Sequence, residues 1–269
     1  MIKKISVYFL LVTTLGAALF AISCGTGFKD ISTANGRKAI LDQANDFLTS
    51  GNCESAIEIL TPLYISAYVD YEIRMTYASA YACKGGFSFT GVMGGLISGS
   101  GDIWSALVKA DFSTGSDGKL ISLKKAAEIV RLTSGIDPSN QSYFSAKYRT
   151  EEANLYMVFI HATIVAVVIA TPQVGNAYRD TGKKRLAITG AGASADHCAA
   201  EVALATISDS LGSISSSGTA LNSIKSAITT VCGANCTGAN LDPTKCDATI
   251  QLVGQGVLVA IDAQWTLGP

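Results

Sequence analysis

The feature that most constrains this fold is a long stretch without formal charge. No charged residue occurs between Glu152 and Arg179, and nearly all side chains from Leu155 to Thr171 are apolar. A helix that is apolar on every side must be covered by other helices or by lipid. At about 1.5 Å per residue, a helix over this segment reaches only about 25 Å, less than the ~30 Å of membrane hydrocarbon. We therefore expect a very apolar central helix buried in a helical protein, with membrane insertion as the alternative.

The rest of the chain also has helical periodicity. Apolar residues recur at helical spacing at Ile40, Ala44 and Phe47, and again at Ala56 and Leu60. Further helical patterns cover residues 119–134, 195–214, 221–231 and about 248–263. No charged linker divides the C-terminal half, so the sequence predicts one all-α body over residues 37–269, with 37–118 and 119–269 as its two parts.

The N-terminus has the layout of a secretory signal peptide. Lys3 and Lys4 form a basic start, and an uncharged, apolar run follows to Ser23. The run ends at Ala21-Ile22-Ser23-Cys24-Gly25, which resembles the lipobox of bacterial lipoproteins, although that family usually has Leu where Ala21 stands. The resemblance implies cleavage after residue 23 and lipidation of Cys24. An ordinary cleaved signal or an uncleaved anchor helix is the alternative.

The mature chain would start with a tether over residues 24–36, which are small and polar. Several acyl chains on Cys24 would hold it on a membrane, because each buried methylene stabilises binding by about 0.8 kcal/mol. Gly25 is not the Asp that resembles an inner-membrane retention signal, so we expect the outer membrane, facing the periplasm. The mature net charge of −3 and the lack of a basic cluster argue against nucleic acid as a partner.

Cysteine usage fits export. Six cysteines remain besides Cys24, an even number that favours disulfides in an oxidising compartment. Buried free thiols are the alternative. The candidates are Cys53, Cys83, Cys198, Cys232, Cys236 and Cys246.

An internal repeat lies near the start of the mature chain. One constant shift places Ala44 on Ala78 and Phe47 on Tyr81, and it also places Gly51 on Gly85. The period of about 34 positions and the order of small, aromatic and turn residues resemble the tetratricopeptide repeat over residues 37–90. The resemblance implies stacked antiparallel helical hairpins; a generic pair of hairpins is the alternative.

The departures from this repeat family are specific. Ile40 and Arg74 stand where the family has an early Trp, and Pro62 lies within the expected second helix. Glycines also interrupt the second helix of the second copy. In the repeat register, Cys53 begins the second helix of the first repeat and Cys83 ends the first helix of the second. The resemblance therefore implies a Cys53–Cys83 disulfide, which leaves the other four cysteines to pair among themselves.

Residues 85–118 combine nine glycines with apolar side chains such as Phe87, Val92 and Trp104. A polar glycine tract would be a linker, but an apolar one has to be covered. We expect a loop or broken helix packed on the core. A mobile segment that faces a membrane or covers a ligand is the alternative.

Two short motifs resemble cofactor or metal sites. Gly190-x-Gly192-x-x-Ala195, followed by Asp209, is a form of the dinucleotide fingerprint, but the chain lacks alternating strands and helices. Asp196-His197-Cys198 could supply metal ligands, but exported thiols tend to be oxidised and Cys232-x₃-Cys236 lacks the usual zinc spacing. We expect neither a cofactor nor a metal, and a disulfide at Cys198.

No catalytic residue stands out. Glu151 and Glu152 are adjacent, so their carboxylates point apart on a helix and fit a solvated helix start. His161 lies in the apolar segment, where a satisfied core histidine is the simpler interpretation. The sequence therefore predicts that this is not an enzyme.

The expected function is a non-catalytic interaction scaffold or assembly partner in the cell envelope, because stacked hairpins present concave surfaces to proteins. A second hypothesis is an accessory protein that binds a small or apolar ligand in a cavity lined by the apolar glycine-rich segment and the helix over 155–171. It resembles the tetratricopeptide-like lipoproteins associated with periplasmic solute transporters. A third is a membrane-inserted structural protein.

Overall fold

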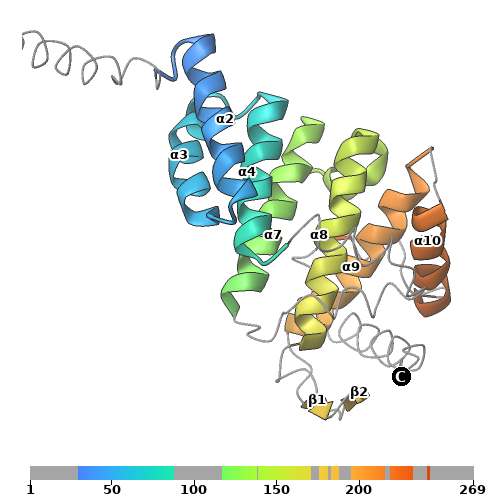
Figure 1. Ribbon diagram of the computed structural model, residues 1–269. Coiled ribbons are helices and arrows are strands. Elements are labelled where there is room, and N and C mark those ends of the chain that lie inside the picture. The colour runs from blue at the N-terminus through green and yellow to red at the C-terminus, as the bar shows by residue number, and fades with distance from the viewer. Residues whose placement is uncertain are drawn as a thin grey trace, which may run out of the picture.

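The structure is a computed structural model of the full chain (Figure 1). It describes residues 30–87, 117–137, 139–170, 176–180, 183–187, 195–215, 219–232 and 241–242. These residues contain seven α-helices: α2 (Ala34–Thr49), α3 (Cys53–Ser66), α4 (Tyr71–Lys84), α7 (Asp117–Arg131), α8 (Glu151–Ala170), α9 (Ala195–Gly212) and α10 (Thr219–Cys232).

The helices pack in sequence order. Each of α3, α4, α7, α8 and α9 contacts the helix before it and the helix after it, and α10 packs on α9 (Figure 1). The helices form successive antiparallel pairs, α2 with α3, α4 with α7, and α8 with α9. The all-α prediction is confirmed at this level. The glycine-interrupted segment expected in place of the second helix of the second copy lies outside the described residues, and α7 packs on α4 instead.

The start of the body lies earlier than predicted. Thr33 caps α2, with its hydroxyl accepting a hydrogen bond from Gly36 N at 3.0 Å. The Thr33 hydroxyl also donates to Asp30 O at 3.1 Å, and Arg37 donates to Ile31 O at 3.1 Å. The chain is thus fixed to the body from Asp30 onward. The last residues of the predicted tether over 24–36 thus form the capping turn and the first turn of α2, and residues 24–29 lie outside the described residues.

Two glycines turn the chain at equivalent helix ends. Gly51 after α2 and Gly86 after α4 have φ of 74° and 86°. In each turn the amide of the next residue bonds back into the last turn of the helix, Asn52 N to Phe47 O and Phe87 N to Ala82 O. This C-terminal motif requires the left-handed conformation that glycine adopts freely. Gly51 therefore corresponds to Gly86, one position later than the predicted register.

Gly85, which the predicted register treated as the turn, has another role. Its φ is −73°, and a Cβ at this position would lie 2.5 Å from Leu123 Cγ and 3.1 Å from Lys119 O. The missing side chain allows the end of α4 to approach α7 closely. Leu123 is fully buried, so it has little room to move.

Gly85→Ala should therefore lower the free energy of unfolding by about 1–3 kcal/mol, the usual effect of overpacking. Gly212→Ala is the matched control, because nothing lies within 4 Å of its Cβ. That control should be neutral or slightly stabilising, since alanine favours a helix over glycine. Urea unfolding of both variants measures the difference, and equal stabilities would show that α4 and α7 do not touch at Gly85.

The central helix is α8. Met157, Ile160 and Val165 are buried on it and pack into the main core. Its buried surface also includes polar side chains, above all Asn154 and His161, so the expected uniformly apolar helix is not found. In the part of the chain that the structure describes, no helix is long and apolar enough to cross a membrane.

A small β-hairpin was missed. β1 (Asn176–Asp180) pairs antiparallel with β2 (Lys183–Ala187), in the register Tyr178 opposite Arg185. The sequence predicted only a basic polar turn between Arg179 and Arg185. The reason is that these strands lack the apolar alternation from which a half-buried strand is recognised.

The other helical predictions agree with the structure. The pattern over 119–134 corresponds to α7 and a 3₁₀ turn (Leu132–Ser134), and those over 195–214 and 221–231 correspond to α9 and α10. Two more 3₁₀ turns, Gln141–Phe144 and Ala146–Tyr148, precede α8. The glycine-rich segment from residue 88 to 116 and the expected helix over 248–263 lie outside the described residues.

Candidate functional site

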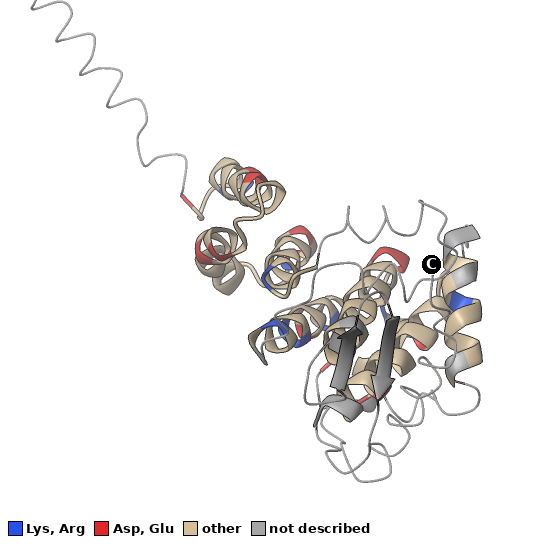
Figure 2. Cartoon of the chain, turned by 60° about the horizontal axis from the view of Figure 1, so that its bottom comes forward, with Lys and Arg blue, Asp and Glu red and all other residues tan. Residues whose placement is uncertain are grey.

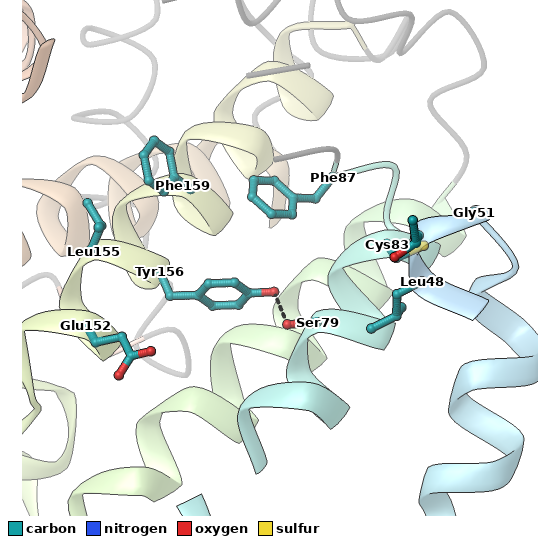
Figure 3. A pocket seen from close by; sticks show the side chains of 10 residues that line it. Leu48, Gly51, Ser79, Cys83, Phe87, Glu152, Leu155, Tyr156 and Phe159 are labelled. Atoms are coloured by element: carbon teal, nitrogen blue, oxygen red, sulfur yellow. Dashed lines mark hydrogen bonds between the residues drawn. The ribbon is translucent and has the colours of Figure 1, made fainter. Parts of the chain in front are cut away.

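A pocket of about 640 Å³ lies where the end of α2, the second half of α4 and the first turns of α8 come together (Figure 3). These are the first helices of the three antiparallel pairs, so one side of the stack builds the pocket. Most of the lining is apolar. It consists of Leu48, Thr49, Gly51, Ser79, Cys83, Phe87, Glu152, Leu155, Tyr156 and Phe159.

One polar pair crosses this pocket. Tyr156 extends from α8 toward α4 and donates a hydrogen bond from its hydroxyl to Ser79 Oγ at 2.7 Å (Figure 3). The ring of Phe87 packs edge-on against Tyr156, with centroids 6.0 Å apart. Burial raises the pKa of Tyr156 to about 12, so its hydroxyl remains a neutral donor at physiological pH. The pocket thus offers aromatic surface and two hydroxyl groups, with Glu152 exposed beside them.

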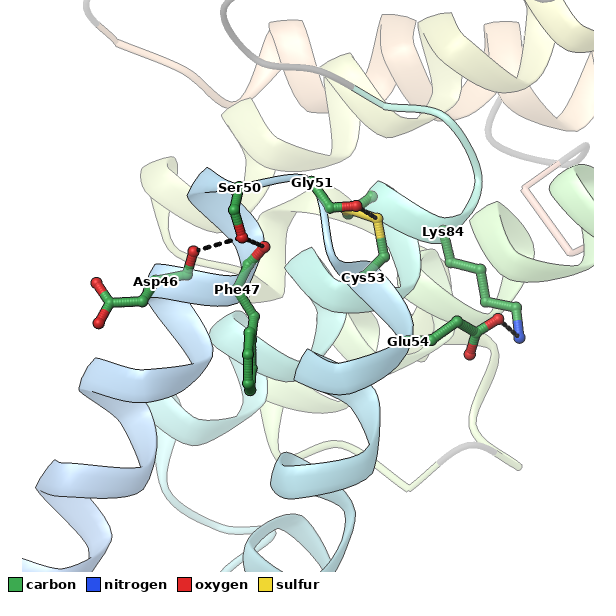
Figure 4. Close-up of a disulfide and its surroundings, with 8 residues drawn as sticks. Asp46, Phe47, Ser50, Gly51, Cys53, Glu54 and Lys84 are labelled. Carbon is green, nitrogen blue, oxygen red and sulfur yellow. Dashed lines mark hydrogen bonds and ion pairs between the residues drawn. A yellow bond between two sulfur atoms is a disulfide. The ribbon is translucent and has the colours of Figure 1, made fainter.

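The predicted disulfide joins this pocket through Cys83, which is one of its lining residues (Figure 3). Figure 4 shows the disulfide from close by. Cys53, the first residue of α3, is bonded to Cys83 near the end of α4, with a Cα separation of 5.5 Å. The predicted pairing is therefore confirmed. Gly51 O lies 3.4 Å from Cys53 Sγ, but a disulfide sulfur has no proton to donate, so this is a contact only. Glu54 and Lys84 form an exposed ion pair at 2.8 Å beside it.

A second group of polar side chains is buried between α7 and α8. Arg131 Nη2 lies 3.3 Å from His161 Nε2, and His161 Nδ1 lies 2.9 Å from Met157 O. A carbonyl oxygen only accepts, so Nδ1 carries the proton and Nε2 accepts from Arg131. Burial, and then the Arg131 charge, lower the pKa of His161 well below its ordinary value. His161 is therefore a neutral, satisfied core residue, as the sequence predicted.

Arg131 itself is held mainly by His161 and by the ring of Phe144, whose centroid is 5.5 Å from its guanidinium carbon. Within the described residues its Nε has no hydrogen-bond partner. Burial lowers the pKa of Arg131 to about 10, so it remains a cation at neutral pH. A buried charge with few partners depends strongly on each of them.

A neighbouring arginine has a different environment. Arg149 donates to Asn154 Oδ1 at 2.9 Å, to Phe144 O at 3.0 Å and to Ser210 Oγ at 3.3 Å. Burial, followed by the charge of Arg131, lowers the pKa of Arg149 to about 10. These bonds connect the turns before α8 to α9, and they give this residue a structural role.

The adjacent carboxylates predicted to point apart do so. Glu151 accepts from Ser215 N at 2.6 Å, whereas Glu152 accepts from the Tyr71 hydroxyl at 3.1 Å. They therefore contact different parts of the chain and do not form an acid–base pair.

Asp209, the acidic residue that follows the glycine motif, accepts a hydrogen bond from Ala146 N at 2.6 Å. It thus caps the turn before α8. Gly190 and Gly192 of the same motif lie outside the described residues, and so do the side chains of Asp196 and His197.

The remaining predicted cysteines are only partly placed. Cys198 and Cys232 are both buried and both disulfide-bonded, so neither sulfur is a free thiolate. Cys236, Cys246 and the expected lipidation site Cys24 lie outside the described residues. Pairing in the C-terminal half and lipidation of Cys24 stay predictions.

Charged residues of both signs occur on neighbouring helices (Figure 2). On α7, Lys125 pairs with Glu128 at 3.0 Å, and both side chains are about half exposed. Such exposed pairs contribute little to stability.

Sequence reasoning expected helix 155–171 to line a cavity, but it missed that α2 and α4 line this pocket as well. Leu48 and Tyr156 were each interpreted as part of a helix pattern, and Ser79 carried no signal. The repeat pattern could have predicted which helices line the pocket, because every second helix of a hairpin stack faces the same side. Because α7 was not predicted to pair with α4, α8 was not predicted to be the third helix on the side of α2 and α4.

No protein-family model, curated protein or solved structure matches this chain. The function therefore has to be argued from the site alone.

Proposed function

We propose that this protein is a non-catalytic binding protein of the cell envelope. A lipid on Cys24 holds it in the outer membrane, where it faces the periplasm. It binds a segment of a partner protein on the side formed by α2, α4 and α8. The observation that carries the proposal is the pocket shared by these three helices. Its apolar and aromatic lining suits an apolar side chain of the partner. Tyr156 and Ser79 provide hydrogen-bonding groups for its backbone.

The helix pairing supports a tetratricopeptide-like arrangement. Two pairs end their first helix with the same glycine turn, at Gly51 and Gly86, and the small residues Ala44 and Ala78 of these helices are fully buried. The long connection between α4 and α7 is a departure from that family. Arg74, at the family's Trp position, donates hydrogen bonds to Tyr68 O and Leu132 O, so it takes over the packing between helix ends.

A second candidate is a small apolar ligand. The pocket volume of about 640 Å³ falls within the range of about 300–1,000 Å³ that small-molecule sites occupy. Phe87, Leu155 and Phe159 would then contact the ligand directly. In this case the protein would act as an accessory that holds a solute or lipid in the periplasm.

A photo-crosslinking amino acid at Thr49 tests both candidates. Thr49 is exposed and lines the pocket, so the substitution leaves the core intact. The same amino acid at Thr229, an exposed residue of α10, is the matched control. In cells, we expect one discrete protein adduct from position 49 and none from position 229. The purified partner should bind wild type at least tenfold more tightly than Phe159→Arg, because a charge would enter an apolar pocket.

The other outcomes are equally informative. Mass spectrometry of the purified protein under native conditions would show a bound small molecule if the second candidate is correct, and Phe159→Arg should remove it. Equal crosslinking from Thr49 and Thr229, with no bound small molecule, would disprove binding at this pocket. Circular dichroism of Phe159→Arg checks that the helices are still formed.

A further inference from the structure

Four of the five large apolar side chains that are exposed in the described residues form an end patch: Ile65, Tyr68, Val69 and Tyr148. The first three lie at the connection between α3 and α4 and are 71%, 59% and 72% exposed. Tyr148, in the turn before α8, is 44% exposed. The fifth, Ile121, lies near the start of α7 and is 65% exposed.

Hydrogen bonds bring the two loops of the end patch together. Arg74 donates to Tyr68 O and to Leu132 O, which connects the start of α4 to the end of α7. The Tyr71 hydroxyl lies 3.3 Å from Thr150 Oγ1, and Thr150 is close to Tyr148 in the chain. Because α7 ends here, its start, with Ile121, lies at the opposite end of the stack.

The chain enters the body at this same end. The first helix, α2, is antiparallel to α3, so its start lies beside the end of α3 (Figure 1). The capping turn at Asp30 and Thr33 is fixed against that start. Only residues 25–29 separate Asp30 from Cys24, so a fully extended chain of this length spans about 20 Å. A lipid on Cys24 would thus keep the end patch close to the bilayer.

We propose that the end patch rests in the headgroup region of the membrane that carries the Cys24 lipid; this rests on the lipid anchor of the proposed function. Grouped exposed apolar residues on one end mark an interaction site, and tyrosine suits a membrane–water interface. A cation accompanies each tyrosine. The Arg74 guanidinium carbon lies 5.7 Å from the Tyr68 ring centroid, and Lys147 Nζ lies 5.7 Å from that of Tyr148.

Apolar side chains contribute more than charges to the proposed contact between the end patch and the membrane. Asp70 and Glu72 follow Val69 in the chain, so the acidic and basic groups at this end offset each other. Binding should therefore not require anionic lipid. Vesicles of phosphatidylcholine suffice as the probe, and the contact should change little between low and high salt.

The test places a tryptophan at each end of the stack. Tyr68→Trp reports on the end patch, and Ile121→Trp is the matched control of similar exposure at the far end. The full lipoprotein, with its lipid verified by intact mass, is reconstituted in vesicles that contain brominated phosphatidylcholine. The quenching of the parent protein, which contains Trp104 and Trp265, is subtracted. We expect quenching at position 68 to exceed that at 121 roughly twofold or more, because interfacial groups insert about 5–10 Å.

Each outcome has one meaning. Equal quenching at positions 68 and 121 in the lipidated protein would overturn the membrane contact while leaving the anchor intact. Weak quenching at 68, together with dimers in analytical ultracentrifugation, would assign the patch to a second copy and also overturn it. A protein without lipid in the intact mass would instead contradict the anchor of the proposed function.

Discussion

Replacing Cys53 and Cys83 together by alanine should lower the free energy of unfolding by about 3–4 kcal/mol. The two residues are 30 positions apart, and in the chain-entropy model a crosslink over such a loop destabilises the unfolded state by about this amount. Urea unfolding of the double variant and the wild type, both without reductant, gives the difference.

Removing the disulfide should also lower the stability of the helices beside it more than that of distant helices. In a stack where each helix contacts mainly its neighbours, stability differs along the chain. Hydrogen exchange should therefore speed up most in α2, α3 and α4 and least in α10. Glu54→Gln is the matched control, because it removes the exposed ion pair with Lys84 at the same edge. That change should cost under about 1 kcal/mol. A double cysteine variant as stable as this control would contradict the assigned role of the disulfide.

His161→Leu should destabilise the protein by about 1.5–3 kcal/mol, although leucine fits the apolar surroundings, because the buried Arg131 cation loses a hydrogen-bond acceptor. The variant removes the nitrogen that accepts from Arg131 Nη2 at 3.3 Å, and leaves a buried guanidinium with one partner fewer. Urea unfolding of the variant against the wild type measures the loss.

A double-mutant cycle separates the charge from the packing. Arg131→Met removes the charge and leaves His161 Nε2 unbonded, so it should cost about 1–3 kcal/mol. The variant carrying both substitutions lacks the buried Arg131 charge and should be more stable than His161→Leu alone. If the two single effects simply add, Arg131 and His161 do not interact.

The same histidine predicts a pH dependence. The pKa of His161 lies well below its ordinary value of 6.5 in the folded protein, because of burial and the Arg131 charge. Below about pH 6.5 the unfolded chain binds a proton that the folded protein does not accept, so stability falls as pH falls. The slope approaches about 1.4 kcal/mol per pH unit until the folded pKa is reached. The His161→Leu variant should lack this contribution between about pH 6.5 and 5.

The sequence predicted the helices well because their packing follows local patterns. The periodic apolar residues of α7, α9 and α10 are visible over a few turns, and the Cys53–Cys83 pair followed from the repeat register. The register itself was one position off at the turn, since Gly85 and Gly86 are adjacent. Only the backbone conformation shows which of them adopts positive φ.

What the sequence did not predict depends on distant contacts. The partner of α4, which ends at Lys84, begins only at Asp117, so no repeat search of fixed period finds it. Arg131 and His161 are also far apart in the chain, and nothing in their neighbours indicates that they meet. The pocket needs α2, α4 and α8 together. The end patch likewise combines two loops whose sequences are separated by the whole of α7.

The long interval between α4 and α7 has a consequence for the order of folding. Helices α2, α3 and α4 follow one another through turns of three and four residues, whereas α7 begins more than thirty residues after the end of α4. Contacts between residues that are close in the chain form faster than contacts between distant ones. We therefore expect α2, α3 and α4 to form an early unit and α7 to dock later. Both cysteines of the first disulfide belong to that early unit. If the chain is exported from its N-terminus, as its start predicts, Cys53 and Cys83 can be oxidised while α7 is still on the other side of the membrane.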